Sequence, residues 1–160
     1  MLPLTNTRED IEAVVRFAKY APIGERGVST TRAHTLYSPP PLSVYMQEAN
    51  AHMRVYAQLE TKEAIENAEE ILSVDGVDGA FVGPNDLSVS LGCVGRKEPI
   101  YECLARVAAA ASAVGKSWGI ITADRDLIAC AKRHSVDMIS AGSELNMLIN
   151  GCKKVKNDIE

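Results

Sequence analysis

The sequence lacks any hydrophobic run that is long enough to cross a membrane. Its longest clearly apolar stretch, Val107 to Val114, is far shorter than the roughly 20 residues that a spanning helix needs. Charged residues already stand at Arg8, Glu9 and Asp10, where an export signal would turn apolar. We therefore expect a cytoplasmic protein that has no membrane partner.

Concentrated basic charge is also missing. Lys and Arg number 17 against 21 Asp and Glu, which gives a net charge of -4. The one basic cluster is Lys153, Lys154 and Lys156, close to the C-terminus. A nucleic-acid-binding surface needs clustered positive charge to meet the phosphates, so nucleic acid is not an expected partner.

The four cysteines form no CxxC pair, and a zinc site built from Cys and His is therefore not indicated. Cys103, Cys130 and Cys152 fall on the apolar faces of predicted helices. We expect buried, reduced thiols of the kind found in cytosolic proteins.

What the sequence does contain is a regular alternation of strand and helix patterns. Its 160 residues, 46% hydrophobic and 24% charged, suit one domain over residues 1–160. Strands are predicted at 1–4, 54–60, 79–86, 117–122 and 137–141, with helices between them. This order is typical of an α/β fold with a parallel sheet. Five units are fewer than the eight of a closed barrel, so the sheet is either open and doubly wound or part of a barrel.

Two carboxylates stand at the carboxyl ends of consecutive predicted strands. Glu60 ends one apolar run and Asp86 ends the next, and the helix predicted between them makes the two strands parallel. Neighbouring strands lie roughly 5 Å apart, which is close enough for both carboxylates to bind one divalent metal. Such hard oxygen ligands suit Mg²⁺ or Mn²⁺. Alternatively, both acids simply stabilise helix N-termini.

Candidate substrate-binding groups flank these carboxylates. Gln58 lies two residues before the first of them, so strand alternation places both side chains on the same face. Gly83 and Pro84 form a turn whose following amides, beginning with that of Asn85, are placed to face a substrate carboxylate. The alternatives are a buried amide bonded to the backbone at Gln58 and a plain strand exit at the turn.

Three motifs stand in order along the chain: Tyr20 to Gly27, Gln58 to Ala64, and Val74 to Ser88. Together they closely resemble the HpcH/HpaI aldolase family, class II pyruvate aldolases with a TIM-barrel fold, over residues 1 to about 148. The resemblance implies that Glu60 and Asp86 bind the divalent metal. It also implies that the residues against the pyruvate moiety are Gln58, Gly83, Pro84 and Asn85.

The chain departs from the family in one respect. By resemblance, residues 1–4 match the fourth barrel strand, so about five of the eight (β/α) units are present and a partial barrel is expected. In the family, the first three units supply an acid/base histidine and an arginine that holds the oxo acid. No position here matches either group, and no catalytic residue is assigned. His34, His52 and His134 lie outside any such motif and are interpreted as ordinary residues.

The resemblance implies a metal-dependent aldolase that reversibly cleaves a 4-hydroxy-2-oxo acid to pyruvate and an aldehyde. The chain is then expected to be a truncated form with little activity of its own, and the family implies a homo-oligomer that exchanges helices between neighbours. One alternative is a citryl- or malyl-CoA lyase, although no motif suggests a CoA pocket. The other alternative is a non-catalytic, metal-binding remnant.

Overall fold

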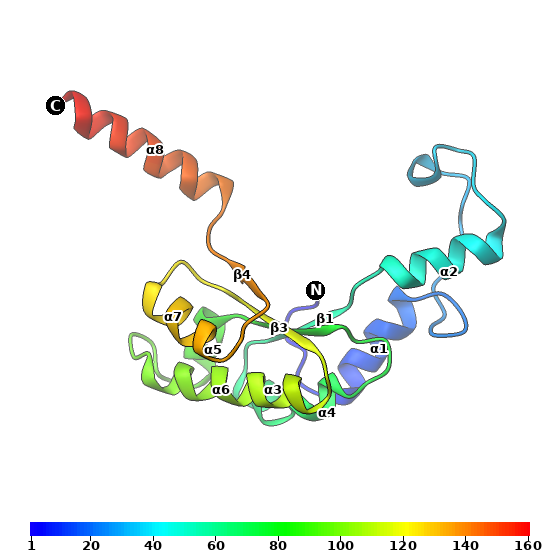
Figure 1. Cartoon of the computed structure of the whole chain (residues 1–160), viewed down its shortest axis with the longest axis horizontal. Coiled ribbons are helices and arrows are strands. Elements are labelled where there is room, and N and C mark those ends of the chain that lie inside the picture. Colours follow the sequence, from blue (N-terminus) through cyan, green and yellow to red (C-terminus); the bar gives the residue numbers. More distant parts are fainter.

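The computed structural model describes residues 1–160 and contains a parallel sheet of four strands. The strands are β1 (Tyr56–Leu59), β2 (Gly79–Val82), β3 (Ser117–Ile121) and β4 (Met138–Ser140). They lie side by side in the order of the sequence, and every neighbouring pair is parallel (Figure 1). The predicted α/β architecture with a parallel sheet is therefore confirmed.

The register of the sheet brings the carboxyl ends of the strands to one edge. Leu59 pairs with Val82, Val82 with Ile120, and Ile120 with Ile139. Because these residues form one row across the sheet, the segments that follow β1, β2, β3 and β4 emerge next to one another.

The strand predicted at residues 1–4 is reduced to a single bridging residue. The amide of Leu2 donates to the carbonyl of Tyr56 at 3.1 Å, and its carbonyl accepts from the amide of Gln58 at 2.9 Å. The chain then turns, and Leu4 adopts a left-handed conformation with a φ of 52°. A left-handed residue ends the extended geometry that a strand requires, so the ladder stops there and the sheet stays open.

Eight α-helices and one 3₁₀ turn connect and cover the strands. They are α1 (Arg8–Ala18), η1 (Ala33–Thr35), α2 (Leu42–His52), α3 (Lys62–Glu66), α4 (Ala68–Leu72), α5 (Pro84–Ser90), α6 (Glu98–Ala113), α7 (Arg125–Arg133) and α8 (Glu144–Ile159). A capping box formed by Thr7 and Asp10 begins α1. Pro99 lies in the first turn of α6, where proline is tolerated because its missing amide has no partner to lose.

Two predicted boundaries are wrong. The helix predicted between the Glu60 and Asp86 strands is divided into α3 and α4 at Asn67, which leaves helical geometry with a ψ of 8°. The strand predicted at 79–86 ends at Val82, and α5 follows from Pro84 to Ser90. Pro84 begins that helix with a backbone already fixed for it, and Leu87 anchors it with no exposed surface.

The hydrophobic core lies between one face of the sheet and the layer of α3, α4 and α6 (Figure 1). Ala57 and Leu59 of β1 point into this layer and are fully buried, as are Leu104 and Val107 of α6. Tyr56 and Gln58, which alternate with them, lie on the opposite face and are only half-buried. At β1 the sheet therefore has one packed face and one partly exposed face, whereas β2 is buried along its whole length.

Helix α8 extends away from this body (Figure 1), and none of its residues is buried. Leu145, Leu148, Ile149 and Val155 recur along α8 at the spacing of one helix face, which predicts an inward side, and the sequence predicts that Cys152 is buried with them. All of these side chains are exposed, so the prediction is wrong for the isolated chain. The apolar face of α8 has no partner within this molecule.

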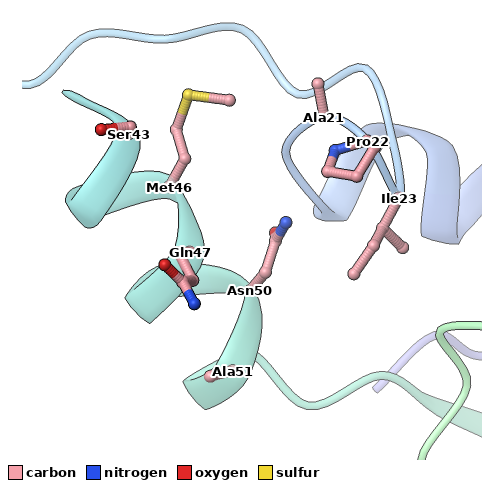
Figure 2. Close-up of a pocket in the computed structure, with 8 residues that line it drawn as sticks. All are labelled: Ala21, Pro22, Ile23, Ser43, Met46, Gln47, Asn50 and Ala51. Atoms are coloured by element: carbon pink, nitrogen blue, oxygen red, sulfur yellow. The ribbon is translucent and has the colours of Figure 1, made fainter.

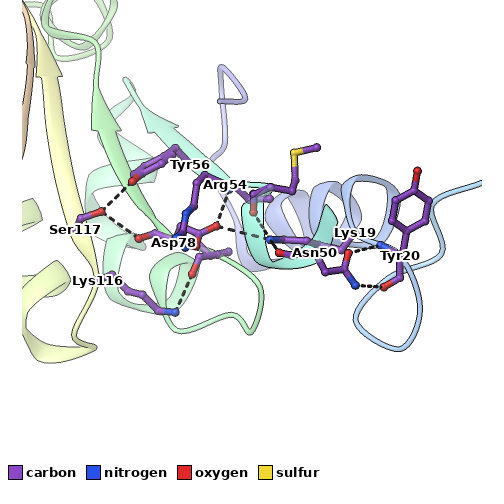
Figure 3. Close-up of polar contacts among 11 residues, drawn as sticks. Lys19, Tyr20, Asn50, Arg54, Tyr56, Asp78, Lys116 and Ser117 are labelled. Atoms are coloured by element: carbon purple, nitrogen blue, oxygen red, sulfur yellow. Dashed lines mark hydrogen bonds and ion pairs between the residues drawn. The ribbon is translucent and has the colours of Figure 1, made fainter. Parts of the chain in front are cut away.

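A polar cluster closes the opposite, amino edge of the sheet (Figure 3). Asp78, just before β2, accepts from the amide of Val55 at 2.7 Å and from the Arg54 guanidinium at 2.8 Å. The Lys19 ammonium lies 3.9 Å from Asp78 and donates to the backbone carbonyls of Asn50 and Met53. The cluster thus joins the ends of α1 and α2 to the starts of β1 and β2.

Burial alone raises the pKa of Asp78, but the Val55 amide and the cations of Arg54 and Lys19 outweigh it, so this pKa lies below the ordinary 3.8. A carboxylate whose pKa is lower in the folded state contributes stability above its unfolded-state pKa. That contribution disappears as the pH falls through the folded-state pKa. Asp78 therefore stabilises the fold at neutral pH and ceases to do so in acid.

We predict that Asp78→Asn lowers the free energy of unfolding by about 1–2 kcal/mol at pH 7, because hydrogen bonds to a charged group are lost. Urea denaturation at several pH values measures the difference, which should shrink to zero as the pH falls below 3.8. Asp75→Asn, an exposed carboxylate in the same loop, is the matched control and should leave stability unchanged. A difference that persists undiminished in acid would contradict this role.

Candidate metal and substrate site

Glu60 is a buried carboxylate at the carboxyl edge of the sheet. It directly follows β1 and is only 3% exposed. One of its oxygens accepts from the amide of Leu4 at 2.8 Å, and the other accepts from the side-chain amide of Gln58 at 2.5 Å. None of the salt bridges in the structure includes Glu60. A buried charge is costly unless it is paired, and here each oxygen keeps a lone pair free for a cation.

Gly83 lies against this carboxylate. A Cβ atom at this position would lie 2.7 Å from a carboxylate oxygen of Glu60 and 3.2 Å from its Cβ. Any residue larger than glycine would therefore displace the Glu60 side chain. The structure brings together Gln58, Glu60 and Gly83, three of the predicted site residues, although they come from two different strand exits.

Asp86 is not at a strand end as predicted. β2 ends at Val82, and Asp86 is the third residue of α5, where it is exposed. Its first-turn position is one that the helix dipole favours for a carboxylate. Asp86 makes no salt bridge or side-chain hydrogen bond within the protein, which leaves both of its oxygens available.

The residues present fit a hard divalent cation. The two carboxylates, one buried without a counter-ion and the other free, supply the oxygen ligands that Mg²⁺ and Mn²⁺ prefer. No group of three or more His, Cys, Asp or Glu side chains is gathered anywhere in the chain. An ion at Glu60 and Asp86 would thus keep several positions for water or substrate, as Mg²⁺ usually does.

A cavity of about 530 Å³ lies at the same edge of the sheet, beyond the ends of β2, β3 and β4. Two of the predicted substrate residues, Pro84 and Asn85, line it. Its other polar lining residues carry no prediction from the sequence; they include Thr122, Asp124, Ser140, Ser143 and Asn146. The available signal was their position, because each lies at or just after the carboxyl end of a predicted strand.

Asp124 supplies the only charge that lines this cavity. The Lys97 ammonium lies 2.6 Å from its carboxylate, and the amides of Leu127 and Asp126 donate to it at 3.1 and 2.9 Å. The Lys97 hydrogen bond, followed by those amides, holds the pKa of Asp124 below its usual value. The carboxylate is therefore ionised at neutral pH and can only accept hydrogen bonds.

A second cavity, of about 620 Å³, lies between α2 and the segment Ala21 to Ile23 (Figure 2). The first of the three sequence motifs, Tyr20 to Gly27, therefore lines a groove with α2. It does not line the cavity at the carboxyl edge of the sheet. Pro22, Ile23 and Met46 make the groove mainly apolar, and none of its lining residues can be ionised. It offers neither a metal ligand nor a proton-transfer group, so we do not place the active site there.

The chain is similar to known aldolases. The family model for HpcH/HpaI aldolase/citrate lyase matches residues 1–151. A 4-hydroxy-2-oxovalerate aldolase from Rhodococcus jostii (strain RHA1) is 35% identical over 154 residues, which are 92% of this chain and 57% of that protein. Another from Novosphingobium aromaticivorans is 36% identical over 130 residues, 80% of this chain and 48% of that protein.

A solved structure shows the same likeness. The HpcH/HpaI aldolase from Desulfitobacterium hafniense DCB-2 superposes with a TM-score of 0.84 at 33% identity, over 97% of this chain and 61% of that one. The chain therefore spans about half to three fifths of the length of the proteins that it matches. The likeness covers the open sheet and both candidate carboxylates.

We predict that Gly83→Ala destabilises the fold by about 1–3 kcal/mol, the usual cost of forcing extra volume into a packed site. The new methyl group would overlap the Glu60 carboxylate, whose burial prevents easy displacement. Chemical denaturation measures the change. Gly27→Ala is the matched control, because a Cβ there meets nothing within 4 Å, and its unfolding midpoint should equal that of the wild type. Equal midpoints for all three proteins would disprove the close packing at Gly83.

Proposed function

Because the chain belongs to the HpcH/HpaI aldolase/citrate lyase family, we propose that it carries the metal-binding and oxo-acid-binding part of a class II aldolase site. The parent reaction is the reversible cleavage of a 4-hydroxy-2-oxo acid to pyruvate and an aldehyde. The observation that carries the proposal is the Glu60 carboxylate, which is buried at the sheet edge without any cationic partner.

In this proposal, Glu60 and Asp86 hold one Mg²⁺ or Mn²⁺ ion. When bound, the ion supplies Lewis-acid stabilisation of the negative charge that develops on the oxo acid during cleavage. The Gln58 amide orients Glu60 through its hydrogen bond and retains a second N–H for the substrate. Gly83 and Pro84 lie against the pyruvate moiety, and the backbone amides that follow, beginning at Asn85, face its carboxylate.

No histidine of residues 1–160 is placed to transfer a proton at the proposed site. The His52 ring lies within hydrogen-bonding distance of the Glu48 carbonyl in α2, at 2.7 Å, and His34 lies against Tyr45. His134 lies at the end of α7, before β4. None of the three lines the cavity at the carboxyl edge, so none is placed to act on a substrate beside Glu60.

Two other functions are compatible with this site. A citryl- or malyl-CoA lyase would use a similar carboxylate pair, and the matching family includes citrate lyases by name. A non-catalytic protein that binds a metal and an oxo acid would need no proton-transfer group at all, and the placement of the three histidines favours this second possibility for residues 1–160.

We also propose that the protein assembles as a homo-oligomer in the cytoplasm. The unpartnered apolar face of α8, with Met147, Leu148 and Val155 exposed, supports association, because such faces are normally covered in solution. No helix combines the length and the apolar character that crossing a membrane would require.

We predict that the wild-type chain binds one Mg²⁺ or Mn²⁺ and that Glu60→Gln and Asp86→Asn each weaken this binding by more than about tenfold. Even residues that merely orient metal ligands contribute about 10–100-fold to affinity. Isothermal titration calorimetry measures the affinities. Glu63→Gln, an exposed acid in α3, is the control and should bind as the wild type does. Equal affinity in all four proteins would refute the site.

We further predict that the 160-residue chain turns over a 4-hydroxy-2-oxo acid more slowly than about 1 per second, the lower end of ordinary enzyme rates. A positioned acid or base typically contributes about 10²–10⁴-fold, and no histidine lines this site. Pyruvate release can be followed with a coupled assay in the presence of Mg²⁺ or Mn²⁺. Faster turnover would show that a proton-transfer group has been overlooked.

A further inference from the structure

The cavity at the carboxyl edge extends from the proposed oxo-acid site toward the far edge of the sheet. Pro84 and Asn85 belong to both, because they follow Gly83 directly and also line the cavity. Its other walls come from the residues after β3 and from β4 and the start of α8. Its volume of about 530 Å³ lies in the range of small-molecule sites.

The cavity walls carry unused hydrogen-bonding groups. The side chains of Asn85, Ser140 and Asn146 make no hydrogen bond within the protein, although all three line the space. The hydroxyls of Thr122 and Ser143 accept from the amides of Asp124 and Asn146, at 3.1 and 3.3 Å, so their O–H groups remain free to donate. The walls therefore offer both donors and acceptors, which match the hydroxyl groups of a ligand.

The charge of the cavity disfavours an anionic ligand. No lysine, arginine or histidine lines it, and its one charged group is the Asp124 carboxylate. The Lys97 ammonium that faces Asp124 is already shared between that carboxylate and Asp126, at 2.6 and 2.8 Å. A ligand carboxylate would meet Asp124 without a free cation to offset the repulsion, whereas a hydroxyl would donate to it.

We propose that this cavity receives the aldehyde-derived part of the substrate. It selects a substrate tail that carries hydroxyl groups but no second carboxylate. The inference rests on the proposed function, because the oxo-acid end must be held beside Glu60 for the remainder to reach Asn85 and Asn146. The substrate class is thus a hydroxylated 4-hydroxy-2-oxo acid with an uncharged tail, formed from pyruvate and a hydroxyaldehyde.

The test compares three ligands on the 160-residue chain in the presence of Mg²⁺, by isothermal titration calorimetry. The ligands are pyruvate, 4,5,6-trihydroxy-2-oxohexanoate and 4-hydroxy-2-oxoheptanedioate. The trihydroxy acid should bind at least about tenfold more tightly than pyruvate, as two ordinary hydrogen bonds would give. The dicarboxylate should gain no affinity over pyruvate.

Two variants, with one control, connect the gain in affinity for the trihydroxy acid to the cavity. Asn146→Ala should reduce the affinity ratio between the trihydroxy acid and pyruvate several-fold, whereas Asn150→Ala, one turn further along α8 and outside the cavity, should not change it. Asp124→Asn, which retains an N-cap for α7, should narrow the difference between the trihydroxy acid and the dicarboxylate.

The outcomes separate this inference from the function on which it rests. If pyruvate binds but the trihydroxy acid binds no more tightly, the cavity is not the subsite, and the proposed function stands. If the dicarboxylate binds as tightly as the trihydroxy acid, the selection for an uncharged tail is overturned. If pyruvate fails to bind in the presence of Mg²⁺, the proposed function and the inference both fail.

Discussion

The parallel register of the four strands is the constraint on which the rest of this molecule depends. Because Leu59, Val82, Ile120 and Ile139 form one row, four segments that are distant in sequence leave the sheet at one edge. Backbone pairing thereby places polar groups together that have no reason to meet in the unfolded chain. The opposite edge is closed by the Asp78 cluster, so stability and candidate function occupy different ends of the same strands, as in barrel enzymes.

Burial gives the two candidate carboxylates different properties. Glu60 has lost its contact with water and is held by the Leu4 and Gln58 donors, which fixes its orientation but leaves its charge without a counter-ion. Asp86 stays in solvent on the first turn of α5. The proposed metal site would therefore combine a buried ligand held by two hydrogen bonds with a solvent-exposed one.

Three surfaces of the chain have no partner within the molecule. The partly exposed face of β1, the edge beyond Leu2 and the apolar side of α8 would each bury apolar area only against further protein. Association is therefore physically favoured. The cavity at the carboxyl edge is lined by hydroxyl and amide groups together with the Asp124 carboxylate.

The sequence by itself determined the alternation of strands and helices, the parallel order and the closeness of Gln58 to Glu60, because these follow from periodicity and from adjacent positions. It also carried the family motifs. It did not determine the bridge at Leu2, the helical position of Asp86 or the exposure of α8, because each depends on which surfaces find a partner. The cavity built by Asn85, Asp124, Ser140 and Asn146 was decided only by tertiary structure, since strand register alone brings those residues together.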